Sequence, residues 1–291
     1  MLAIPEREPS ASRWATRAAL FAFGLIAAAA FLHRLFGLPT PVAFNLFALA
    51  LAVAALSILF ALFAALVIWQ TGRPGTARVL VAICVSLALL AAPLLYLMWV
   101  RDHPLLSDIT TDFENPPAFA AVARLRGPGD NSIAYNRRRS ADEQASAYPD
   151  IKPVRIARSS EEAYALVVDA VKRLKLEIAR EEPPDPGAGT PGEIEAVDRT
   201  LIMGFYEDVA IRVSGDGETA RVDIRSASRF GRADMGRNAE RIRALVKEIQ
   251  GRVDATMPTA QDAREQAKRA KPEKGADPRS DRRRRSRDRG Q

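Results

Sequence analysis

The sequence is poor in the side chains from which most metal and catalytic sites are built. It contains one cysteine, Cys84, so it can form neither an internal disulfide nor a zinc site with several cysteine ligands. Its two histidines, His33 and His103, lie at the ends of apolar segments, and no histidine follows them. The commonest general base and metal ligand is therefore missing beyond residue 103. We expect no metal, no cofactor and no catalytic residue in that part of the chain.

Charge is scarce between residues 18 and 100, where Ala, Leu, Val and Phe dominate. Three windows are apolar enough to span a bilayer, at about residues 18–32, 42–69 and 79–100. The third contains Pro93, which membrane helices tolerate. The last two windows contain no Asp, Glu, Lys or Arg. Because ion pathways and proton relays usually need buried charge, this absence argues against a transporter or a channel.

The arginines that flank these windows predict the orientation of the helices. Five arginines lie on one side of the predicted helices, before the first window or between the last two: Arg7, Arg13, Arg17, Arg73 and Arg78. Only two lie on the other side, Arg34 and Arg101. By the positive-inside rule, residues 1–17 are expected in the cytoplasm, and the region after residue 100 in the periplasm or outside the cell. This is the topology of a multi-pass protein of the inner (plasma) membrane. An alternative treats residues 1–30 as a cleaved signal peptide, which leaves the C-terminal region on the same side.

The net charge of +7 comes mainly from the C-terminal tail. Residues 271–291 hold nine Lys and Arg against four Asp and Glu, which leaves only +2 for residues 1–270. The tail lacks the apolar area that would offset ordering, so residues 258–291 are expected to be disordered. Outside the membrane, its run Arg282–Arg285 would meet anionic lipid or an envelope polymer, and we expect no nucleic acid there. The alternative is a solvating tail without a single partner.

Local patterns predict a soluble α+β domain over residues 101–257. Ser159 and Glu162 form a capping box before an amphipathic helix, and a second such helix begins near Asp234 and runs to Val253. Between the helices, alternating apolar residues predict strands around residues 175–178, 193–197, 201–213 and 220–227. We expect an antiparallel four-stranded meander whose apolar face both helices cover. Together with the three-helix α-helical membrane anchor, this domain defines the predicted fold class.

Seven stretches between residues 104 and 250 carry a recurrent pattern. They are Asp108–Asp112, Pro116–Phe119, Ala147–Ile151, Ile194–Ala196, Gly204–Val209, Val222–Arg229 and Gly231–Ala239. In this order they resemble the family known as domain of unknown function 1499. Glu207 departs from the family pattern, which usually shows Asp at that position. The change keeps the negative charge and lengthens the side chain. The resemblance implies that membrane helices often precede the domain, and it implies no established activity.

Charged residues alternate with apolar ones along the last two predicted strands. If the apolar residues face the core, the charged ones share the opposite face. They are Asp208, Arg212, Arg221, Asp223 and Arg225. An open sheet face with fixed charges of both signs would suit an anionic or zwitterionic ligand. The alternative is a cross-strand ladder of ion pairs on a solvated face.

The segment that joins the last strand to the last helix is a second candidate. It contains Ser226, Ser228, Arg229 and Arg232, and it ends at the helix N-terminus near Asp234. Backbone N–H groups, the helix dipole and two arginines would suit a phosphate or a carboxylate. The alternative is a connection whose serines satisfy local backbone groups.

Two other chemistries have weaker support. Four carboxylates would bind a hard cation if the fold gathered them: Asp112, Glu207, Asp208 and Asp223. A serine nucleophile at Ser226 or Ser228 has neither a histidine partner nor a surrounding G-x-S-x-G turn.

These observations favour a non-enzymatic, membrane-anchored binding or interaction domain that recognises an anionic envelope ligand. The alternative is an envelope hydrolase or transferase that uses the Arg and Asp residues of the sheet face. A cleft that joins Asp208, Asp223, Arg225 and Arg229 would favour the enzyme, and a flat, solvated charged face would favour the binding domain.

Overall fold

The computed structural model describes residues 7–101, 104–201 and 203–256. The predicted disorder of residues 258–291, and the partner expected for Arg282–Arg285, lie outside the described residues.

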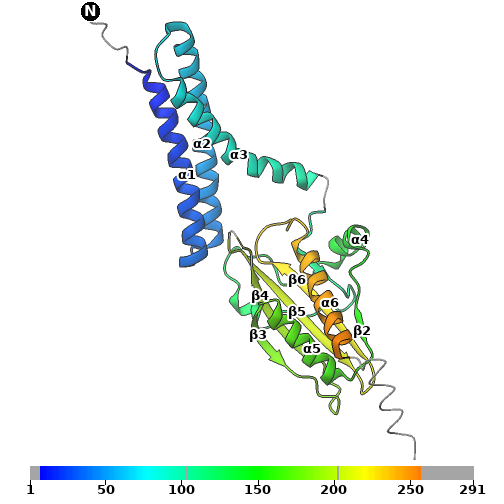
Figure 1. Ribbon diagram of the computed structural model, residues 1–291. Coiled ribbons are helices and arrows are strands. Elements are labelled where there is room, and N and C mark those ends of the chain that lie inside the picture. Colours follow the sequence, from blue (N-terminus) through cyan, green and yellow to red (C-terminus); the bar gives the residue numbers. More distant parts are fainter. Residues whose placement is uncertain (1–6, 102–103, 202, 257–291) are drawn as a thin grey trace, which may run out of the picture. The chain divides into compact units, whose positions relative to one another are not determined.

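The N-terminal part of the chain forms three long helices (Figure 1). They are α1 (Ser10–Phe36), α2 (Thr40–Thr71) and α3 (Thr76–Arg101), and each is long and apolar enough to cross a membrane. All three extend beyond the predicted apolar windows. Glycines with positive φ, Gly37 (69°) and Gly72 (71°), end α1 and α2, because this backbone conformation is open to a residue without a Cβ. Pro93 lies inside α3.

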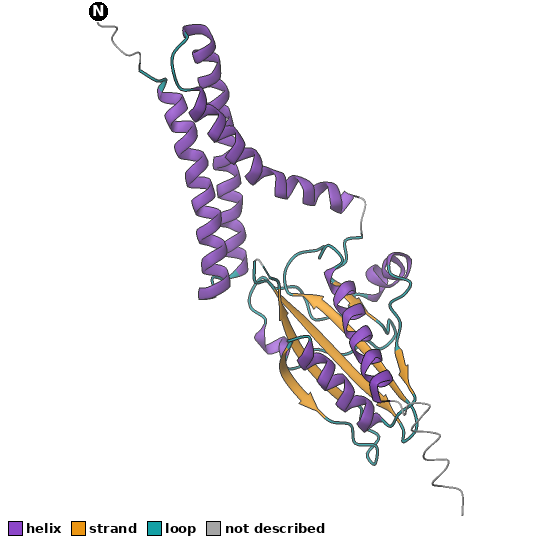
Figure 2. Ribbon diagram, in the orientation of Figure 1, coloured by secondary structure: helices purple, strands orange, loops and turns teal. Residues whose placement is uncertain are grey.

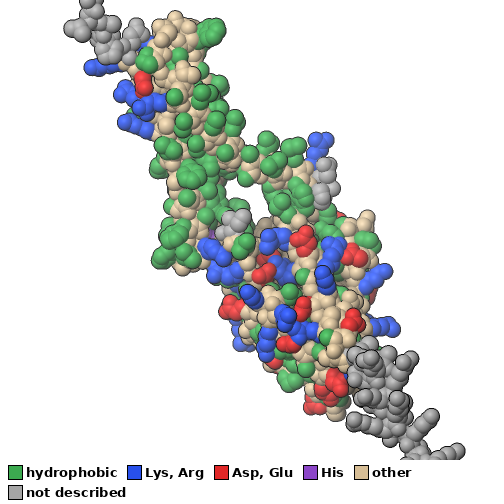
Figure 3. Space-filling model, in the orientation of Figure 1, with side chains coloured by type: hydrophobic (Ala, Val, Ile, Leu, Met, Phe, Trp, Pro, Cys, Tyr) green, Lys and Arg blue, Asp and Glu red, His purple; other side chains and the backbone are tan. Residues whose placement is uncertain are grey.

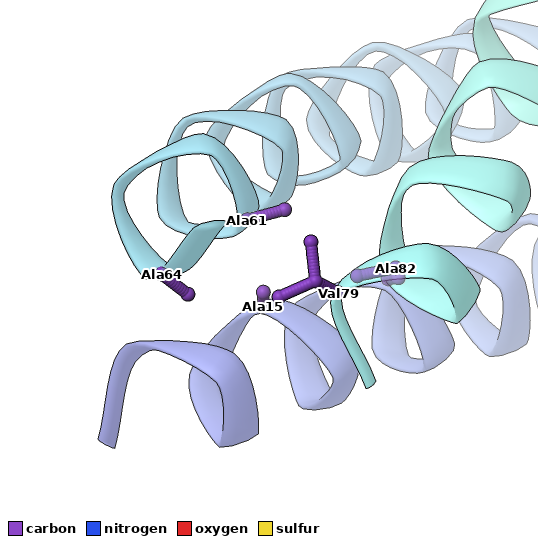
Figure 4. Packing of buried hydrophobic residues seen from close by; sticks show 6 residues of the cluster. Ala15, Ala61, Ala64, Val79 and Ala82 are labelled. Carbon is purple, nitrogen blue, oxygen red and sulfur yellow. The ribbon is translucent and has the colours of Figure 1, made fainter. Parts of the chain in front are cut away.

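Small side chains allow the three helices to approach closely (Figure 4). Their buried cluster consists of Ala15, Ala19, Ala61, Ala64, Val79 and Ala82. Ser57 of α2 adds a hydrogen bond to the Ala15 carbonyl at 2.9 Å. Small residues and single polar contacts are the means by which helices associate in lipid, where the hydrophobic effect cannot drive them together. The large side chains point outward, so the visible surface of these helices is mostly hydrophobic (Figure 3).

The rest of the described chain is built on one antiparallel sheet. Its strands are β1 (Asp108–Thr110), β2 (Val154–Ile156), β3 (Glu177–Glu182), β4 (Gly192–Arg199), β5 (Tyr206–Gly215) and β6 (Ala220–Ser228). The order is β1-β6-β5-β4-β3, and β2 also pairs with β6. The predicted meander corresponds to β3–β6, but the predicted number of four strands is wrong. β1 and β2 are only three residues long, too short to show an alternating pattern, and both come from the lead-in before residue 158.

Two helices lie side by side across one face of the sheet (Figures 1 and 2). They are α5 (Ser160–Arg173) and α6 (Arg237–Thr256). The predicted capping box is present in part: the Ser159 hydroxyl accepts a hydrogen bond from the Glu162 amide at 3.2 Å. Asp234 accepts hydrogen bonds from the Gly236 and Asn238 amides at the start of α6. A further helix, α4 (Arg137–Ala147), was not predicted because its sequence is almost wholly polar.

The opposite face of the sheet is also covered. Phe119 and Val122 pack against Val197, Ala210 and Ala227 on that face. Val122 begins a short 3₁₀ helix, η1 (Val122–Leu125), within the lead-in. The expectation of an open, charged sheet face is therefore wrong. That face is covered by a further layer of the chain and is largely buried beneath it. The domain has three layers: two helices, the sheet, and the irregular segment 111–136, which we call the covering segment or covering layer.

Candidate functional site

The charged face of the sheet has the predicted composition and contains three groups of ion pairs. In the first, Asp208 of β5 is fully buried. Its carboxylate accepts hydrogen bonds from Arg126 Nε at 2.8 Å and from Arg229 Nη2 at 2.7 Å. The Arg229 guanidinium also lies over the Tyr206 ring, 5.0 Å from its centroid. Asp208 and Arg229 thus bind one another and the covering segment, and Arg229 also lines a cavity of about 510 Å³ with Leu125 and Tyr206.

The second group surrounds Arg225 of β6, which is 3% exposed. Its guanidinium makes a two-pronged contact with the Asp108 carboxylate, at 2.9 and 2.7 Å. It also donates to the Ile133 carbonyl at 2.8 Å and lies over the Phe119 ring, 4.4 Å from the centroid. Such fork-like pairing with a carboxylate is the geometry in which arginine is most specific. These contacts tie β6 to Asp108 of β1 and to the covering segment at Phe119 and Ile133.

The third group lies where β5 ends and β6 begins. Asp223 is almost fully buried and accepts hydrogen bonds from Arg212 Nη2 and Arg221 Nη2, each at 3.0 Å. Asp112 of the covering segment joins the same two arginines, at 3.2 Å from Arg212 and 2.9 Å from Arg221. The Arg221 side chain remains 43% exposed. This group differs from the first two because part of it reaches solvent.

The electrostatics of the third group keep Asp112 ionised. Burial alone would raise the pKa of Asp112, but hydrogen bonds from the Asn115 and Glu114 amides, together with Arg221 and Arg212, lower it below its usual value of 3.8. An ionised carboxylate fixes the positions of both guanidinium groups. Arg155 of β2 lies directly opposite Arg221 across the strand pair, which adds a third positive charge beside two carboxylates. Glu193 of β4 lies directly opposite Arg212 in the same way, so positive and negative charges around this group are balanced.

A cavity of about 370 Å³ opens beside this third group. Its charged lining is Asp112, Arg212, Arg221 and Asp223. The remainder comes from the covering segment, the β3–β4 loop, the end of β5 and the start of α5: Asn115, Ser160, Pro184, Pro186, Gly189, Thr190, Pro191, Val213, Ser214 and Gly215. The volume falls within the range typical of small-molecule sites. We call it the arginine cavity.

The residues of the second predicted site, Ser226 to Asp234, lie on two different faces of the sheet. β6 continues to Ser228, so alternation places Ser226 and Ser228 on the helix face and Arg229 on the other. Ser226 donates to the Asn238 side chain at 2.7 Å, and Ser228 accepts from the same amide at 3.0 Å. Arg232 is exposed and lines a smaller cavity of about 210 Å³ with Asp108, Asn131 and Ser140. The structure does not bring these predicted residues to one site.

The helix face contains a buried polar network centred on Arg241 of α6. This arginine pairs with Asp198 at 2.7 Å and with Glu207, and it donates to the Ser226 hydroxyl at 3.0 Å. Burial raises the pKa of Glu207, although Arg241 and Arg237 act to lower it. Burial likewise raises the pKa of Asp234 against the lowering effect of its hydrogen bonds from Asn238 and Gly236. The network closes the space between β5, β6 and α6.

The four carboxylates considered for a cation site are not assembled. Asp112 and Asp223 share two arginines, Asp208 is held by two others, and Glu207 lies on the opposite face of the sheet. Within the described ranges, no three His, Cys, Asp or Glu side chains are close enough together to hold a metal ion.

Several contributors to the charged face were absent from the sequence-based candidates. Arg126, Asn131 and Glu195 are the main ones. Glu195 is almost fully buried and accepts hydrogen bonds from the Ala120, Ala121 and Val122 amides, at 2.9–3.0 Å. The Asn131 side chain donates to the Ser228 and Gly231 carbonyls at 2.9 and 2.7 Å. Two sequence signals bore on Glu195: its place within the family-like stretch Ile194–Ala196, and its position in the predicted strand 193–197.

The same part of the chain matches a known protein family. A family described as protein of unknown function (DUF1499) matches residues 108–249, from the start of β1 into α6. The match covers the sheet, its covering segment and both helices. No curated protein matches the chain.

Proposed function

Residues 108–249 belong to the DUF1499 family. From that premise we propose that the protein is a membrane-anchored, non-enzymatic module, and that it binds a small anionic molecule in the arginine cavity. The three apolar helices are the anchor, and they cross the inner (plasma) membrane. The sheet domain lies on the extracytoplasmic side, in the periplasm or outside the cell. The ligand carries a phosphate or carboxylate group and belongs to the envelope, as a free molecule, a lipid headgroup or part of a polymer.

The charge distribution supports the orientation. Five arginines flank the helices on the proposed cytoplasmic side, and two on the other. An odd number of crossings then carries the chain from a cytoplasmic N-terminus to an extracytoplasmic domain.

The observation that carries the binding proposal is the exposure of Arg221 at the mouth of a cavity of about 370 Å³. Arg212 and Arg221 are oriented by Asp112 and Asp223, so their remaining N–H groups are positioned before any ligand arrives. Pre-oriented donors lower the entropic cost of binding. Planar guanidinium groups suit phosphate and carboxylate oxygens.

The arrangement supports catalysis less well than binding. Both carboxylates at the cavity are engaged by arginines, and the pKa of Asp112 is lowered by its amide and arginine neighbours against the effect of burial. A general acid or base near neutral pH needs the opposite shift. The predicted cleft joining Asp208, Asp223, Arg225 and Arg229 is also missing from the described structure, because Asp208 and Arg225 are enclosed by the covering segment.

Thermal shift of the full-length protein in detergent tests the proposal. Inorganic phosphate, glycerol phosphate, short-chain anionic phospholipid and small carboxylates serve as probes. We expect at least one class to stabilise the protein, and Arg221→Gln to weaken its binding by at least about tenfold, since a hydrogen bond to a charged group contributes about 1.5–3 kcal/mol. Arg243→Gln removes an exposed arginine that pairs with Asp150 away from the cavity, and it should leave binding unchanged. Equal binding by wild type and Arg221→Gln would contradict the proposal.

A further inference from the structure

The loop between β4 and β5 is apolar at its tip. Its sequence is Thr200-Leu201-Ile202-Met203-Gly204-Phe205, whereas strand connections are normally rich in polar and turn-forming residues. Leu201 is 80% exposed. The base of the loop is well ordered by hydrogen bonds: the Thr200 amide donates to the Phe205 carbonyl at 2.9 Å, and the Gly204 amide donates to the Thr200 carbonyl at 3.0 Å. Above this hydrogen-bonded base, the apolar side chain of Leu201 is exposed.

The base of this loop is bonded to the last turn of α1. His33 Nδ1 lies 2.7 Å from the Met203 carbonyl oxygen, and Arg34 Nη1 donates to the Thr200 carbonyl at 2.8 Å. Arg199 Nη2 in turn donates to the Arg34 carbonyl at 3.0 Å. Arg34 lies in the last turn of α1, two residues after the predicted apolar window 18–32, and basic residues are common where a spanning helix meets the headgroups. The loop base is thereby tied to the end of α1 at which the proposed anchor would meet the headgroups.

A second loop at the same end of the sheet contacts the helices through aromatic rings. Phe230, just after β6, lies 4.6 Å from Phe44 of α2, measured between ring centroids. Phe205 of the first loop lies 5.4 Å from the same Phe44 ring. Met235 in the second loop is 49% exposed. The β4–β5 loop and the segment after β6 lie at the same end of the sheet. Both thus expose apolar side chains beside the ends of α1 and α2.

We propose that this end of the sheet domain, with Leu201 at its tip, inserts into the interface of the bilayer that the three helices cross. The partner is lipid: an interfacial segment buries its apolar side chains about 5–10 Å into the boundary between headgroups and acyl chains. Arg34 and the exposed Arg199 flank the tip and place positive charge at the headgroups. The inference rests on the proposed membrane anchor and is independent of ligand binding.

The position of the arginine cavity follows from this contact. β5 runs ten residues, from Tyr206 beside the apolar loop to Gly215 in the cavity wall, which separates the two ends by roughly 30 Å. With one end of the sheet at the bilayer, the cavity opens to the aqueous compartment.

Depth-dependent fluorescence quenching in proteoliposomes tests the contact on the full-length chain. In a Cys84→Ser background, Leu201→Cys is labelled with an environment-sensitive fluorophore and exposed to lipids that carry a nitroxide near the headgroup. Glu218→Cys is the matched control, because Glu218 is exposed on the β5–β6 hairpin at the opposite end of the sheet. Wild-type Cys84, labelled in detergent before reconstitution, reports insertion of α3, where its side chain is exposed.

We expect strong quenching and a blue-shifted emission at Leu201→Cys, and neither at Glu218→Cys. Leu201 is so exposed that its substitution should not disturb folding. Quenching at Cys84 together with equal, weak signals at Leu201→Cys and Glu218→Cys would overturn the contact while leaving the anchor intact. Lack of quenching at all three positions would overturn both the anchor and the contact.

Discussion

The Arg229 guanidinium donates two hydrogen bonds to the Asp208 carboxylate, from Nη2 at 2.7 Å and from Nε at 2.9 Å, and both side chains are buried. The pair joins β6 to β5, and Arg126 extends it to the covering segment. Arg229 was a candidate for an anion-binding turn because it precedes a helix in the sequence. Its carboxylate partner on the neighbouring strand makes it a structural residue.

Replacing Arg229 with Ala is therefore expected to destabilise the fold. Removal of one partner from a buried ion pair costs about 3–5 kcal/mol, because the remaining charge loses its compensation. Arg126 still contacts Asp208, so we expect a loss near the lower end of that range. Unfolding of the full-length protein in detergent, followed by intrinsic fluorescence against denaturant, measures the change. Arg232→Ala, at an exposed position of the same segment, should shift stability by less than about 0.5 kcal/mol; equal losses in both variants would contradict this assignment.

Glu195 is expected to be the main support of the covering segment. Its carboxylate accepts three backbone N–H groups at the start of η1, and Arg180 pairs with it at 3.3 Å. Glu195→Ala leaves those amides without an acceptor, at a cost of about 1–3 kcal/mol for each buried group that water cannot reach. We expect a clear loss of stability and faster proteolysis within residues 111–136, read by mass spectrometry of the fragments.

The matched control for Glu195 is its neighbour Glu193. It also pairs with Arg180, at 2.9 Å, but it lies near solvent, where an ion pair contributes about 0–1 kcal/mol. If Glu193→Ala exposed residues 111–136 to protease as strongly as Glu195→Ala does, the capping role of Glu195 would be wrong.

Local patterns in the sequence sufficed for the elements whose contacts are local. The capping box predicted the start of α5, and period-two alternation placed Asp208, Arg212, Asp223 and Arg225 on one face, as the structure confirms. Turn residues between adjacent strands predicted the antiparallel pairing of β3 to β6.

The covering layer escaped prediction because its contacts are remote in sequence. Asp108 pairs with Arg225, and β1 and β2 each add three residues to β6. Neither a three-residue strand nor an irregular segment has a period from which its partner can be recognised. Without that layer, the charged face looked solvated. The sequence could therefore identify the residues of the face, but not which of them remain accessible to a ligand.

Glu207 is expected to make stability depend on pH in the acid range. Burial raises its pKa above the usual 4.5, so the folded protein binds this proton more tightly than the unfolded chain. The stabilisation from that proton is fully present below pH 4.5 and is lost as pH rises through the raised value. Glu207→Gln resembles the protonated form at every pH. We expect it to match or exceed wild-type thermal stability at pH 7, and to lose that relative advantage as pH falls. A stability difference that stays constant from pH 7 to pH 4 would contradict the shift.

The proposed topology predicts the activity of reporters fused along the chain. Alkaline phosphatase, which is active only outside the cytoplasm, should be active after Leu38, inactive after Arg73, and active after Val253. The reason is that α1, α2 and α3 would each reverse the side of the membrane, and the arginines around residues 7–17 and 73–78 would hold their loops in the cytoplasm. A cytoplasmic reporter such as a fluorescent protein that needs a reducing compartment should give the opposite pattern. Because the junction after Val253 lies beyond the family domain, the sheet domain is intact in that fusion. If alkaline phosphatase fused after Val253 were inactive and the cytoplasmic reporter at that position were active, the arginine cavity would lie on the cytoplasmic side. Its ligand could then no longer be an envelope component.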